Sequence, residues 1–551
     1  MRVLGINAIY HDPAAALVVD GKLVAAAEEE RFSRRKHGKR PVPFSAWEMP
    51  TLSARWCLEQ AGLQPEDVDV ATYSFDPGLH RPADELGLFD PWDHLRATYA
   101  EHAGGFLADG LPGFDPERLR YVPHHLAHAA SAGLAAPFDG SCAVLVLDGR
   151  GERHSHLAGR YAADGQFEPL FSQSLPHSLG LLYEDATAHL GFLRSSDEYK
   201  VMALAAYGTP RYAAELRELV HATGDGGFVS TGVDWNVLAK ARRPTEEWTA
   251  EHADLAASLQ LVLEETLLDL ARWLRDRSGE RNLALAGGVA LNCVANSRIA
   301  AEAGFERVWV QPAAGDAGTA LGGALTASVR AGDGAPAMTS AALGRGFADD
   351  ETEAALRTAR LPYERPDDVA ESVAECLAAD GIVAWFQGRS EYGPRALGHR
   401  SLLAHPGRSE NLARLNDVKG REQFRPVAPM VLLERAPQIF SRGPIPSPYM
   451  LFVHDVAPEW RDRIPTVTHV DGTARIQTVD RNDEPLVARM LECFERRTGL
   501  PVVVNTSLNT AGRPMVDDPR DALECFGSAP VDLLAIGPFV VRRPKATPRP
   551  Q

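Results

Sequence analysis

Two segments of the chain run from an apolar strand through a glycine-rich turn into an alanine-rich helix. They are "NLALAGGVALN" at 282–292 and "RVWVQPAAGDAGTALGGALTA" at 307–327. Repeated units of this kind predict an α/β sheet that binds its ligands at the strand ends. Nearer the N-terminus, "AAALVV" and "KLVAAAEEE" flank Asp20-Gly21, which is typical of a tight β-hairpin, and "CAVLVLDG" predicts another strand that ends at Asp148.

The length of the chain, 551 residues, exceeds one ordinary core and predicts at least two domains. Residues 328–350 are small, polar and turn-forming, so we place the boundary there. We therefore expect an N-terminal domain over 1–340 and a C-terminal domain over 345–551. Short strands with polar turns predict that the C-terminal domain is of the mixed α+β class.

The formal net charge of −17 argues against a nucleic-acid partner, because nucleic-acid binding needs a basic surface. The N-terminus begins as a strand, and no apolar run reaches transmembrane length, so we expect a cytoplasmic protein without a membrane partner. The six cysteines lie far apart and form no C-x-x-C motif. Reduced, buried thiols are therefore expected rather than disulfides or a thiolate zinc site.

The segment "HHLAHA" places His124 and His128 four residues apart, on one face if the segment is helical. This spacing alone is weak evidence, since such pairs are more often surface or capping groups. Asp148 and Asp316 add to it because each follows a strand, where an α/β sheet presents carboxylates to its ligands. The four residues together predict a mixed nitrogen and oxygen metal site, which suits Fe(II), Mn or Zn.

The glycine turns "AGGVALN", which contains Gly287, Gly288 and Asn292, and "GDAGTALGG" lack the full spacing of a P-loop or a dinucleotide motif. Gly149 follows Asp148 in a third turn, "LDGRGE". By themselves they could be ordinary tight turns. However, "GINAIYHD", "LDGRGE", "LAGGVALN" and "GDAGTALGG" follow the order of the nucleotide-binding segments in the actin, sugar-kinase and heat-shock ATPase fold. Backbone amides in such turns hold phosphoryl oxygens, so we predict nucleotide contacts there.

His11 and Asp12 directly follow the first strand, and a histidine paired with a carboxylate can act as a general base near neutral pH. A structural histidine is an equally good interpretation of this pair. Lys36, in the charged run "EEERFSRRKHGKR", is our candidate phosphate contact, although this run could also be a solvated helix end.

The C-terminal half concentrates anion-binding side chains in turns rich in glycine and proline. Because arginine binds phosphate and carboxylate through two parallel hydrogen bonds, this clustering predicts a phosphoanion site in an otherwise acidic chain. The side chains are Arg389, Arg395, Arg400, Lys419, Arg421 and Arg425, followed by Arg475 and Arg513.

Eight motifs in order, from end to end of the chain, resemble the NodU/CmcH family of O-carbamoyltransferases. The resemblance implies an N-terminal domain similar to the tRNA threonylcarbamoyl transferase, which is an actin-like ATPase (ASKHA) relative with an H-x-x-x-H metal site. It also implies a C-terminal YrdC-like domain that forms an acyl adenylate. The motifs are "FSRRKHG", "HHLAHA", "LDGRGE", "EYKVMALAAYG", "GRSEYGPRALGHRS", "KGREQFRPVAP", "HVDGTARIQTV" and "NTSLNTAGRPMV".

The same resemblance implies roles for individual residues. The ligands of an iron ion would be His124, His128, Asp148 and Asp316. Alternatively, Asp148 would be a ligand shared with the bound adenylate. Lys36 would contact the nucleotide phosphate, and His11 would be the general base for the acceptor. Carbamoyl phosphate and ATP, with Mg, would be held by Arg395, Lys419, Arg421, Arg425, Arg475 and Asn505. His399 and Arg513 depart from the residues expected in relatives, which leaves the contacts near the carbamoyl phosphate site open.

The expected function is therefore ATP-dependent O-carbamoyl transfer in antibiotic biosynthesis. Carbamoyl adenylate would be made from carbamoyl phosphate and ATP, and its carbamoyl group passed to a hydroxyl of a small natural product. A sugar of a macrolide or aminoglycoside is the favoured acceptor, and a homodimer is left open. Two alternatives remain: a tRNA-modification or hydrogenase-maturation enzyme of the same superfamily, and a non-enzymatic actin-like ATP switch.

Overall fold

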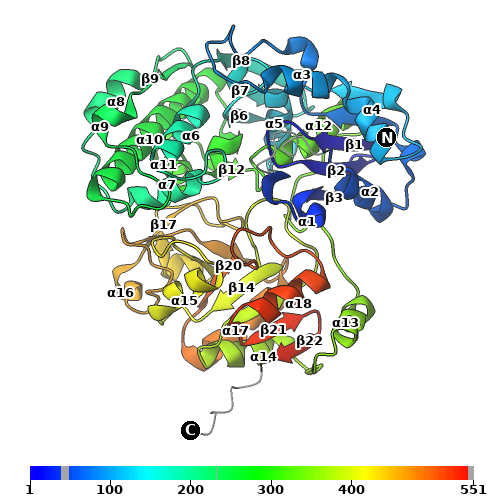
Figure 1. The fold of residues 1–551 in the computed structure, drawn as a ribbon, viewed down its shortest axis with the longest axis vertical. Helices are drawn as coiled ribbons and strands as arrows, with labels where there is room; N and C mark the ends of the chain where they lie inside the picture. The colour runs from blue at the N-terminus through cyan, green and yellow to red at the C-terminus, as the bar shows by residue number, and fades with distance from the viewer. Residues whose placement is uncertain (39–48, 231, 544–551) are drawn as a thin grey trace. The chain divides into compact units, whose positions relative to one another are not determined.

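The computed structural model describes residues 1–38, 49–230 and 232–543 (Figure 1). The chain forms two compact units. The N-terminal unit comprises Met1–Ala341 together with Tyr392–Pro394, and the C-terminal unit comprises Ala342–Glu391 and Arg395–Gln551. The division falls inside the turn-forming segment 328–350, whereas the return of Tyr392–Pro394 to the N-terminal unit has no signal in the sequence.

The N-terminal unit is built from two five-stranded sheets with one topology. The first has the order β3-β2-β1-β4-β5 and the second β12-β11-β6-β7-β8. In each sheet three antiparallel strands are followed by two that run parallel to the first. This duplicated arrangement is that of the actin-like ATPase fold, so the predicted fold class is confirmed. The strands are β1 (Arg2–Asn7), β2 (Ala14–Val19), β3 (Lys22–Glu28), β4 (Val70–Tyr73), β5 (Leu119–Tyr121), β6 (Cys142–Leu147), β7 (His154–Tyr161), β8 (Phe167–Ser174), β11 (Asn282–Ala286) and β12 (Arg307–Val310).

The predicted local elements of this unit are present. The β2–β3 hairpin turns at Asp20-Gly21, both with positive φ (48° and 72°), and this is the turn that the pair favours. The strands β11 and β12 each lead through a glycine turn into a helix, as predicted. A small antiparallel pair, β9 (Val220–Ala222) and β10 (Phe228–Ser230), lies apart from the two sheets.

Two helices lie between the two sheets. Helix α12 (Ala317–Arg330) packs on β1, β2 and β4 of the first sheet, and α5 (His124–Gly133) packs on β6, β7 and β11 of the second (Figure 1). The two helices also pack on each other, so the unit is layered as sheet, helix, helix and sheet. The turns that follow β6 and β12 can therefore meet helix α5 at the centre of these layers.

The remaining helices of the unit cover the outer parts of the sheets. The longest, α10 (Ala250–Ser278), ends at Gly279, which has the left-handed φ of 69° that glycine adopts most easily. It packs against α7, α8 and α11. The others are α1 (Glu30–Ser33), α2 (Thr51–Gln60), α3 (Asp93–Glu101), α4 (Ala103–Gly110), α6 (Leu179–His189), α7 (Glu198–Ala205), α8 (Ala213–Leu219), α9 (Trp235–Leu238) and α11 (Cys293–Glu302).

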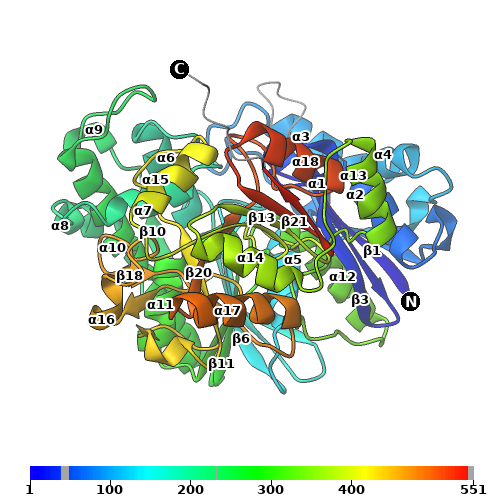
Figure 2. The same cartoon turned by 90° about the horizontal axis from the view of Figure 1, so that it is seen from below.

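The C-terminal unit has a mixed seven-stranded sheet of order β19-β15-β20-β14-β13-β21-β22. Only β13–β21 and β15–β19 are parallel pairs, so the predicted α+β class is confirmed. Helices α14 and α17 run side by side (Figure 2). The main elements are α13 (Asp349–Thr358), α14 (Val369–Ala378), β13 (Val383–Phe386), β14 (Arg400–Ala404), α15 (Glu410–Val418), β15 (Ala428–Leu432), α16 (Pro458–Arg461), β19 (Gln477–Val479), α17 (Pro485–Thr498), β20 (Val502–Ser507), α18 (Pro519–Ser528), β21 (Leu533–Ile536) and β22 (Phe539–Arg542).

A small sheet of β16 (Phe440–Ser441), β17 (His454–Val456) and β18 (Thr473–Ala474) completes this unit. All six cysteines are free thiols, and five of them are buried, as predicted. Among the described residues, no helix combines the length and the apolar composition needed to cross a membrane.

Candidate functional site

Helix α5 carries both histidines of the predicted metal pair. It starts at His124, and His128 follows one turn later on the same face. Both side chains are fully buried. The helix is otherwise rich in alanine, which permits very close packing: a Cβ atom at Gly322 of α12 would lie 1.7 Å from the carbonyl oxygen of Ala127. The two histidines therefore lie at a tight interface of two helices.

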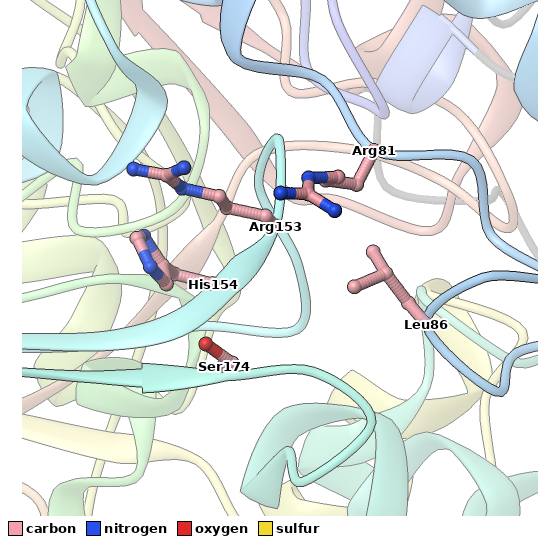
Figure 3. Close-up of a pocket in the computed structure, with 5 residues that line it drawn as sticks. All are labelled: Arg81, Leu86, Arg153, His154 and Ser174. Atoms are coloured by element: carbon pink, nitrogen blue, oxygen red, sulfur yellow. The ribbon is translucent and has the colours of Figure 1, made fainter.

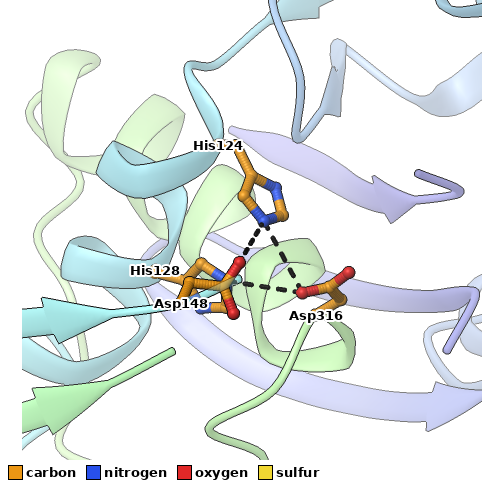
Figure 4. Close-up of side chains that lie close together, drawn as sticks. All are labelled: His124, His128, Asp148 and Asp316. Atoms are coloured by element: carbon orange, nitrogen blue, oxygen red, sulfur yellow. Dashed lines mark ion pairs between the residues drawn. The ribbon is translucent and has the colours of Figure 1, made fainter. Parts of the chain in front are cut away.

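Asp148 and Asp316 reach the same point from other segments. Asp148 directly follows β6, and Asp316 directly precedes α12. The Nε2 atom of His124 lies 3.4 Å from Asp148 Oδ2 and 3.6 Å from Asp316 Oδ1 (Figure 4). The Nε2 atom of His128 lies 3.9 Å and 3.6 Å from the same two oxygens. The structure thus brings together the four residues that the sequence proposed, with one ligand atom from each within 4.8 Å of the others.

The geometry and chemistry of this cluster fit a divalent metal ion. Ligand atoms about 2.1 Å from one ion in tetrahedral geometry lie roughly 3.4 Å apart, close to the separations found here. The Nε2 atoms of both histidines and both carboxylate oxygens of Asp316 are buried without a hydrogen bond to any described residue. Two imidazoles and two carboxylates form the donor set that Fe(II), Mn and Zn accept.

The neighbours of His124 hold its ring for such a role. Its Nδ1–H donates to the carbonyl of Ser74 at 3.0 Å, so in the neutral ring Nε2 is the unprotonated nitrogen that points at the carboxylates. Burial alone would lower the pKa of His124, but Asp148 and Asp316 raise it. Burial would also raise the pKa of Asp316, but His11, His124 and His128 outweigh it and lower that pKa to about 2. Burial raises the pKa of Asp148 as well, but His124 and His128 hold it well below its usual range, so both carboxylates are ionised and attract a cation.

The predicted glycine turns surround Asp148. Gly288 donates its N–H to Asp148 Oδ1 at 2.9 Å. Gly287 has a φ of +91°, and a Cβ atom there would lie 2.1 Å from the carbonyl oxygen of Leu147, so this position requires glycine. Gly149 follows Asp148 in the turn after β6. These turns allow backbone to approach the cluster closely, as a phosphate-binding turn requires.

His11 lies at the edge of the cluster and forms a chain of contacts with two other residues. Its Nδ1–H donates to Asp12 Oδ2 at 2.9 Å, and its Nε2 lies 3.7 Å from Asp316 Oδ2. The second oxygen of Asp12 accepts a hydrogen bond of 2.7 Å from His37 Nδ1. Burial would raise the pKa of Asp12, but the two histidines hold it well below its usual range.

His37 was not among the predicted site residues, and it lies beside Lys36 in a short 3-10 helix over Lys36–Gly38. The backbones of Asp12 and His37 both adopt a left-handed φ, 49° and 58°, which is costly for residues other than glycine. Such strain indicates that the surrounding structure holds the pair in place. Lys36 itself is half-buried, and its side chain contacts no other described residue through a hydrogen bond or ion pair.

Two further residues missed by the sequence analysis support α5. Glu152 is buried, and its Oε1 accepts hydrogen bonds from the amides of His124 (2.8 Å) and Asp76 (2.9 Å). Tyr10 packs its ring edge-on against His124, with centroids 5.4 Å apart, and donates its hydroxyl to the carbonyl of Gly151 at 2.8 Å. The only sequence signal was their proximity to predicted motifs.

Asn292 lies at the start of α11, where its side chain accepts the amide of Ala295 at 3.1 Å. It also exchanges two hydrogen bonds with Gln260. The structure therefore gives Asn292 a capping role, and its predicted nucleotide contact stays a prediction.

In the C-terminal unit, the end of β20 gathers part of the predicted phosphoanion site. Asn505 donates to Gln477 Oε1 at 2.8 Å, and its Oδ1 is buried without a hydrogen-bond partner among the described residues. Lys419 donates to the hydroxyl of Ser507 at 2.9 Å and also to Asn509. Because side chains alternate along a strand, Asn505 and Ser507 point to the same face of β20. Gln477, Ser507 and Asn509 were missed, although two of them lie in "NTSLN".

The arginines predicted for that site divide into two groups. Arg400 is fully buried, its guanidinium donates to the backbone carbonyls of Gln387 and Arg345, and it lies 3.7 Å from the ring centre of Phe386. The expectation that Arg400 belongs to the anion site is therefore wrong, because its donors are used by the backbone. Arg389 likewise donates to the carbonyl of Gly344.

The remaining predicted cations are half-buried on loops. Arg421 donates to Asn416 Oδ1 at 2.5 Å, and Arg425 lies 3.5 Å from Glu422. Arg395 and Arg475 are also half-buried, on separate segments. None of these contacts joins the four residues to Lys419 or Asn505, so their common phosphoanion site stays a prediction.

The structure supplies contacts for the two departures from the resembled family. His399 lies 3.1 Å from Glu484, and although burial lowers its pKa, the charges of Glu484 and Glu391 raise it overall. Arg513 forms an exposed ion pair of 3.1 Å with Glu524. Both side chains thus have carboxylate partners of their own.

The peptide Tyr392-Gly393 belongs to the N-terminal unit and is held by buried side chains of that unit. The Gly393 N–H donates to Glu28 at 2.7 Å, and its carbonyl accepts from Arg31 at 3.0 Å. The hydroxyl of Tyr392 donates to the carbonyl of Ala317, the residue after Asp316. Part of the predicted "EYGPRA" motif therefore supports the start of α12.

Comparisons with known proteins cover most of the chain. Residues 2–82 and 111–325 match the model of the carbamoyltransferase N-terminus, and residues 374–543 match that of the carbamoyltransferase C-terminus. Nodulation protein NolNO of Sinorhizobium fredii is 38% identical over 98% of this chain and 80% of its own length. Nodulation protein U of the same species is 33% identical over 99% of this chain and 100% of its own length. An uncharacterized protein of Synechocystis sp. is 37% identical over 100% of this chain and 97% of its own length.

Proposed function

Because the chain belongs to the carbamoyltransferase family, we propose that it is an ATP-dependent O-carbamoyltransferase that modifies a hydroxyl group of a natural product. The observation that carries the proposal is the buried cluster of His124, His128, Asp148 and Asp316 with His11 at its edge. Membership of a carbamoyltransferase family also favours an enzyme over the non-enzymatic ATP switch.

The first step would be formation of carbamoyl adenylate. Water hydrolyses carbamoyl phosphate to carbamate and phosphate, and a carbamate oxygen then attacks the α-phosphorus of ATP. Pyrophosphate leaves, and a new bond joins the carbamate oxygen to that phosphorus. Lys419, which is buried beside Ser507 and Asn509, offers a positive charge for these anions. Asn505, Arg395, Arg421, Arg425 and Arg475 are the further contacts proposed here.

The second step would be carbamoyl transfer at the four-residue cluster. A divalent ion held by His124, His128, Asp148 and Asp316 would orient the adenylate and polarise its carbamoyl carbonyl. The turn at Gly287-Gly288 brings backbone amides close to Asp148, where the phosphate of the adenylate would be accommodated.

The side chains beside the cluster would handle the proton of the acceptor. Because Nδ1 of His11 donates to Asp12, the neutral ring carries an unprotonated Nε2, which can take the proton of the acceptor hydroxyl. Asp12, itself held by His37, fixes the ring and stabilises the charge that develops on it. The acceptor oxygen then bonds to the carbamoyl carbon, AMP leaves, and the product is a carbamate ester.

The acceptor is proposed as a small hydroxylated molecule, with a sugar of a macrolide or aminoglycoside favoured and antibiotic biosynthesis as the setting. Two of the relatives named above are nodulation proteins, so hydroxylated acceptors outside antibiotic biosynthesis are to be tested beside these.

The experiment is to incubate the full-length protein with ATP, carbamoyl phosphate and a panel of hydroxylated metabolites. Release of AMP and pyrophosphate is measured, and mass spectrometry detects one added carbamoyl group. If neither release depends on carbamoyl phosphate, the proposed reaction is wrong.

The role of the cluster is tested separately. His124→Ala and His128→Ala should lose bound metal and carbamoyl transfer. His221→Ala is the matched control, because this exposed histidine of the same unit makes only a local hydrogen bond with Arg217. Unchanged metal content in both cluster variants would contradict the proposed metal site.

A further inference from the structure

A cavity of about 280 Å³ lies in the N-terminal unit, outside the four-residue cluster. It is lined by Arg81, Leu86, Arg153, His154 and Ser174. In Figure 3 the Arg81 guanidinium lies on the side of Leu86, and the Arg153 guanidinium extends beside the His154 ring. The lining therefore contains two arginines, a histidine and a hydroxyl, and no carboxylate.

Neither of these two guanidinium groups has an ion pair or hydrogen bond with another described residue. Both groups are therefore available to a ligand, unlike the guanidinium of the exposed Arg217, which binds a carboxylate through two hydrogen bonds. Guanidinium groups match phosphate, sulfate and carboxylate, and two of them at one cavity attract an anion strongly.

The polar groups beside the arginines complete a site for an anion. Burial and the neighbouring charge of Arg153 lower the pKa of His154, so its ring is neutral near neutral pH and can donate one hydrogen bond. Ser174 ends β8 directly opposite His154, the first residue of β7, and offers a hydroxyl.

The cavity is connected to the four-residue cluster through Glu152. Arg81 donates its backbone N–H to the carbonyl of Glu152 at 3.0 Å, and the carboxylate of Glu152 accepts the amide of His124 at 2.8 Å. Arg153 lies five residues after Asp148 in the chain, so their Cα atoms are at most roughly 17 Å apart. An acceptor of two or three linked rings is long enough to span a separation of that size.

One wall of the cavity comes from a part of the chain outside the family model. Leu86 belongs to residues 83–110, which lie between the two matched ranges 2–82 and 111–325. This segment is tied to the motif after β6, because Asp90 pairs with Arg150 at 2.7 Å. A wall that the general family pattern does not supply, fixed next to the shared site, is suited to selecting the acceptor of this particular protein.

We infer that this cavity is an acceptor subsite, in which Arg81 and Arg153 bind an anionic substituent of the hydroxylated acceptor: a phosphate, sulfate or carboxylate group. The identity of the ligand as the acceptor rests on the proposed carbamoyl transfer, whereas the anion site itself rests only on the cavity and its two arginines. Leu86 provides the apolar side of the same subsite.

The anion site is tested without any activity measurement. The full-length protein is treated with phenylglyoxal, which modifies arginine, and labelling of individual peptides is measured with and without inorganic phosphate. Phosphate should slow labelling of Arg81 and Arg153 several-fold and leave the control Arg217 unchanged. Equal labelling of Arg81 and Arg153 with and without phosphate would overturn the anion site.

The acceptor assignment is tested with Arg81→Gln and Arg153→Gln, and Arg217→Gln as control. Acceptors are compared in matched pairs, a sugar with and without a phosphate or carboxylate group. The KM for the charged acceptor should rise about tenfold or more in both cavity variants, while the KM values for the neutral acceptor, ATP and carbamoyl phosphate stay unchanged. Arg81→Lys should restore part of the loss.

The other outcomes separate this inference from the proposed reaction. A rise in the KM for ATP or carbamoyl phosphate instead would overturn the acceptor assignment and would indicate that the anion site binds the adenylate. Unchanged KM values for all substrates would also overturn it. Protection of Arg81 and Arg153 by phosphate in a protein that carbamoylates no acceptor would support the anion site and contradict the proposed function.

Discussion

Replacement of Gly322 by alanine would push apart the two helices that carry the metal-ligand cluster. A Cβ atom at this position would lie 1.7 Å from the carbonyl oxygen of Ala127 and 2.8 Å from the amide nitrogen of Ser131, both on α5. Real Cβ contacts are essentially never below 3.0 Å. Because both neighbouring atoms belong to backbone, α5 and α12 must separate by roughly 1 Å or more.

This separation acts directly on the ligand geometry. His124 and His128 lie on α5, and Asp316 immediately precedes α12. Metal sites tolerate ligand distances only within about 0.2 Å, so we expect the affinity for Zn²⁺ or Fe(II) to fall more than tenfold. Overpacking of this kind also costs about 1–3 kcal/mol of folding free energy, which should lower the unfolding temperature by several degrees.

The measurement is a competitive metal titration, with thermal unfolding followed in parallel. Gly105→Ala is the matched control: Gly105 is an exposed residue of helix α4, and a Cβ atom there has no neighbour within 4 Å. The control should keep wild-type metal affinity and gain up to about 1 kcal/mol of stability. If the folded Gly322→Ala variant binds metal as tightly as the Gly105→Ala variant, the close packing of α5 on α12 does not determine the geometry of the metal site.

Three further predictions concern single side chains. Burial raises the pKa of the Glu28 carboxyl group to about 7. The protonated group therefore adds about 3 kcal/mol to the free energy of unfolding below pH 4.5, and this contribution is lost as the pH rises through about 7. Glu28→Gln should remove this part of the pH dependence of urea unfolding, and an unaltered profile would contradict it. His37→Ala should lower kcat about tenfold through loss of a charge-assisted hydrogen bond to Asp12, and His37→Gln, whose amide can donate, should recover most of it. Equal loss in both variants would contradict the orienting role. Lys419→Met should slow pyrophosphate release at least 100-fold by removing the charge beside the anions, whereas Arg489→Gln, an exposed ion pair with Asp368, should leave it unchanged.

Much of the fold was predictable because its signals are local. The Asp20-Gly21 hairpin, the strand ending before Asp148 and the strand, turn and helix unit around Asp316 all follow from residue types at short spacing. The i, i+4 spacing of His124 and His128 likewise required only that the segment be helical. Resemblance of eight motifs to one family then supplied the expected carbamoyl chemistry, and the family models confirm the family.

Contacts between distant segments were not predictable. The hydrogen bond of His37 to Asp12 connects two loops with strained backbones. Arg81 and Arg153 line one cavity, although the first precedes α5 in the chain and the second follows it. Arg400 was misjudged because an arginine in a turn has the same sequence signature whether it faces an anion or donates to buried carbonyls. Burial and the position of neighbouring carbonyls decide between these roles, and neither is a local property.

The sequence by itself determined which side chains could bind a metal, carry a phosphate or end a strand, because residue type and spacing set donor atoms and local conformation. Only the tertiary structure decided that His124, His128, Asp148 and Asp316 converge. Their convergence depends on two helices packed so closely that Gly322 admits no side chain, and on turns at Gly287-Gly288 that let backbone reach a carboxylate. Such packing is a property of many segments at once, so no single motif encodes it.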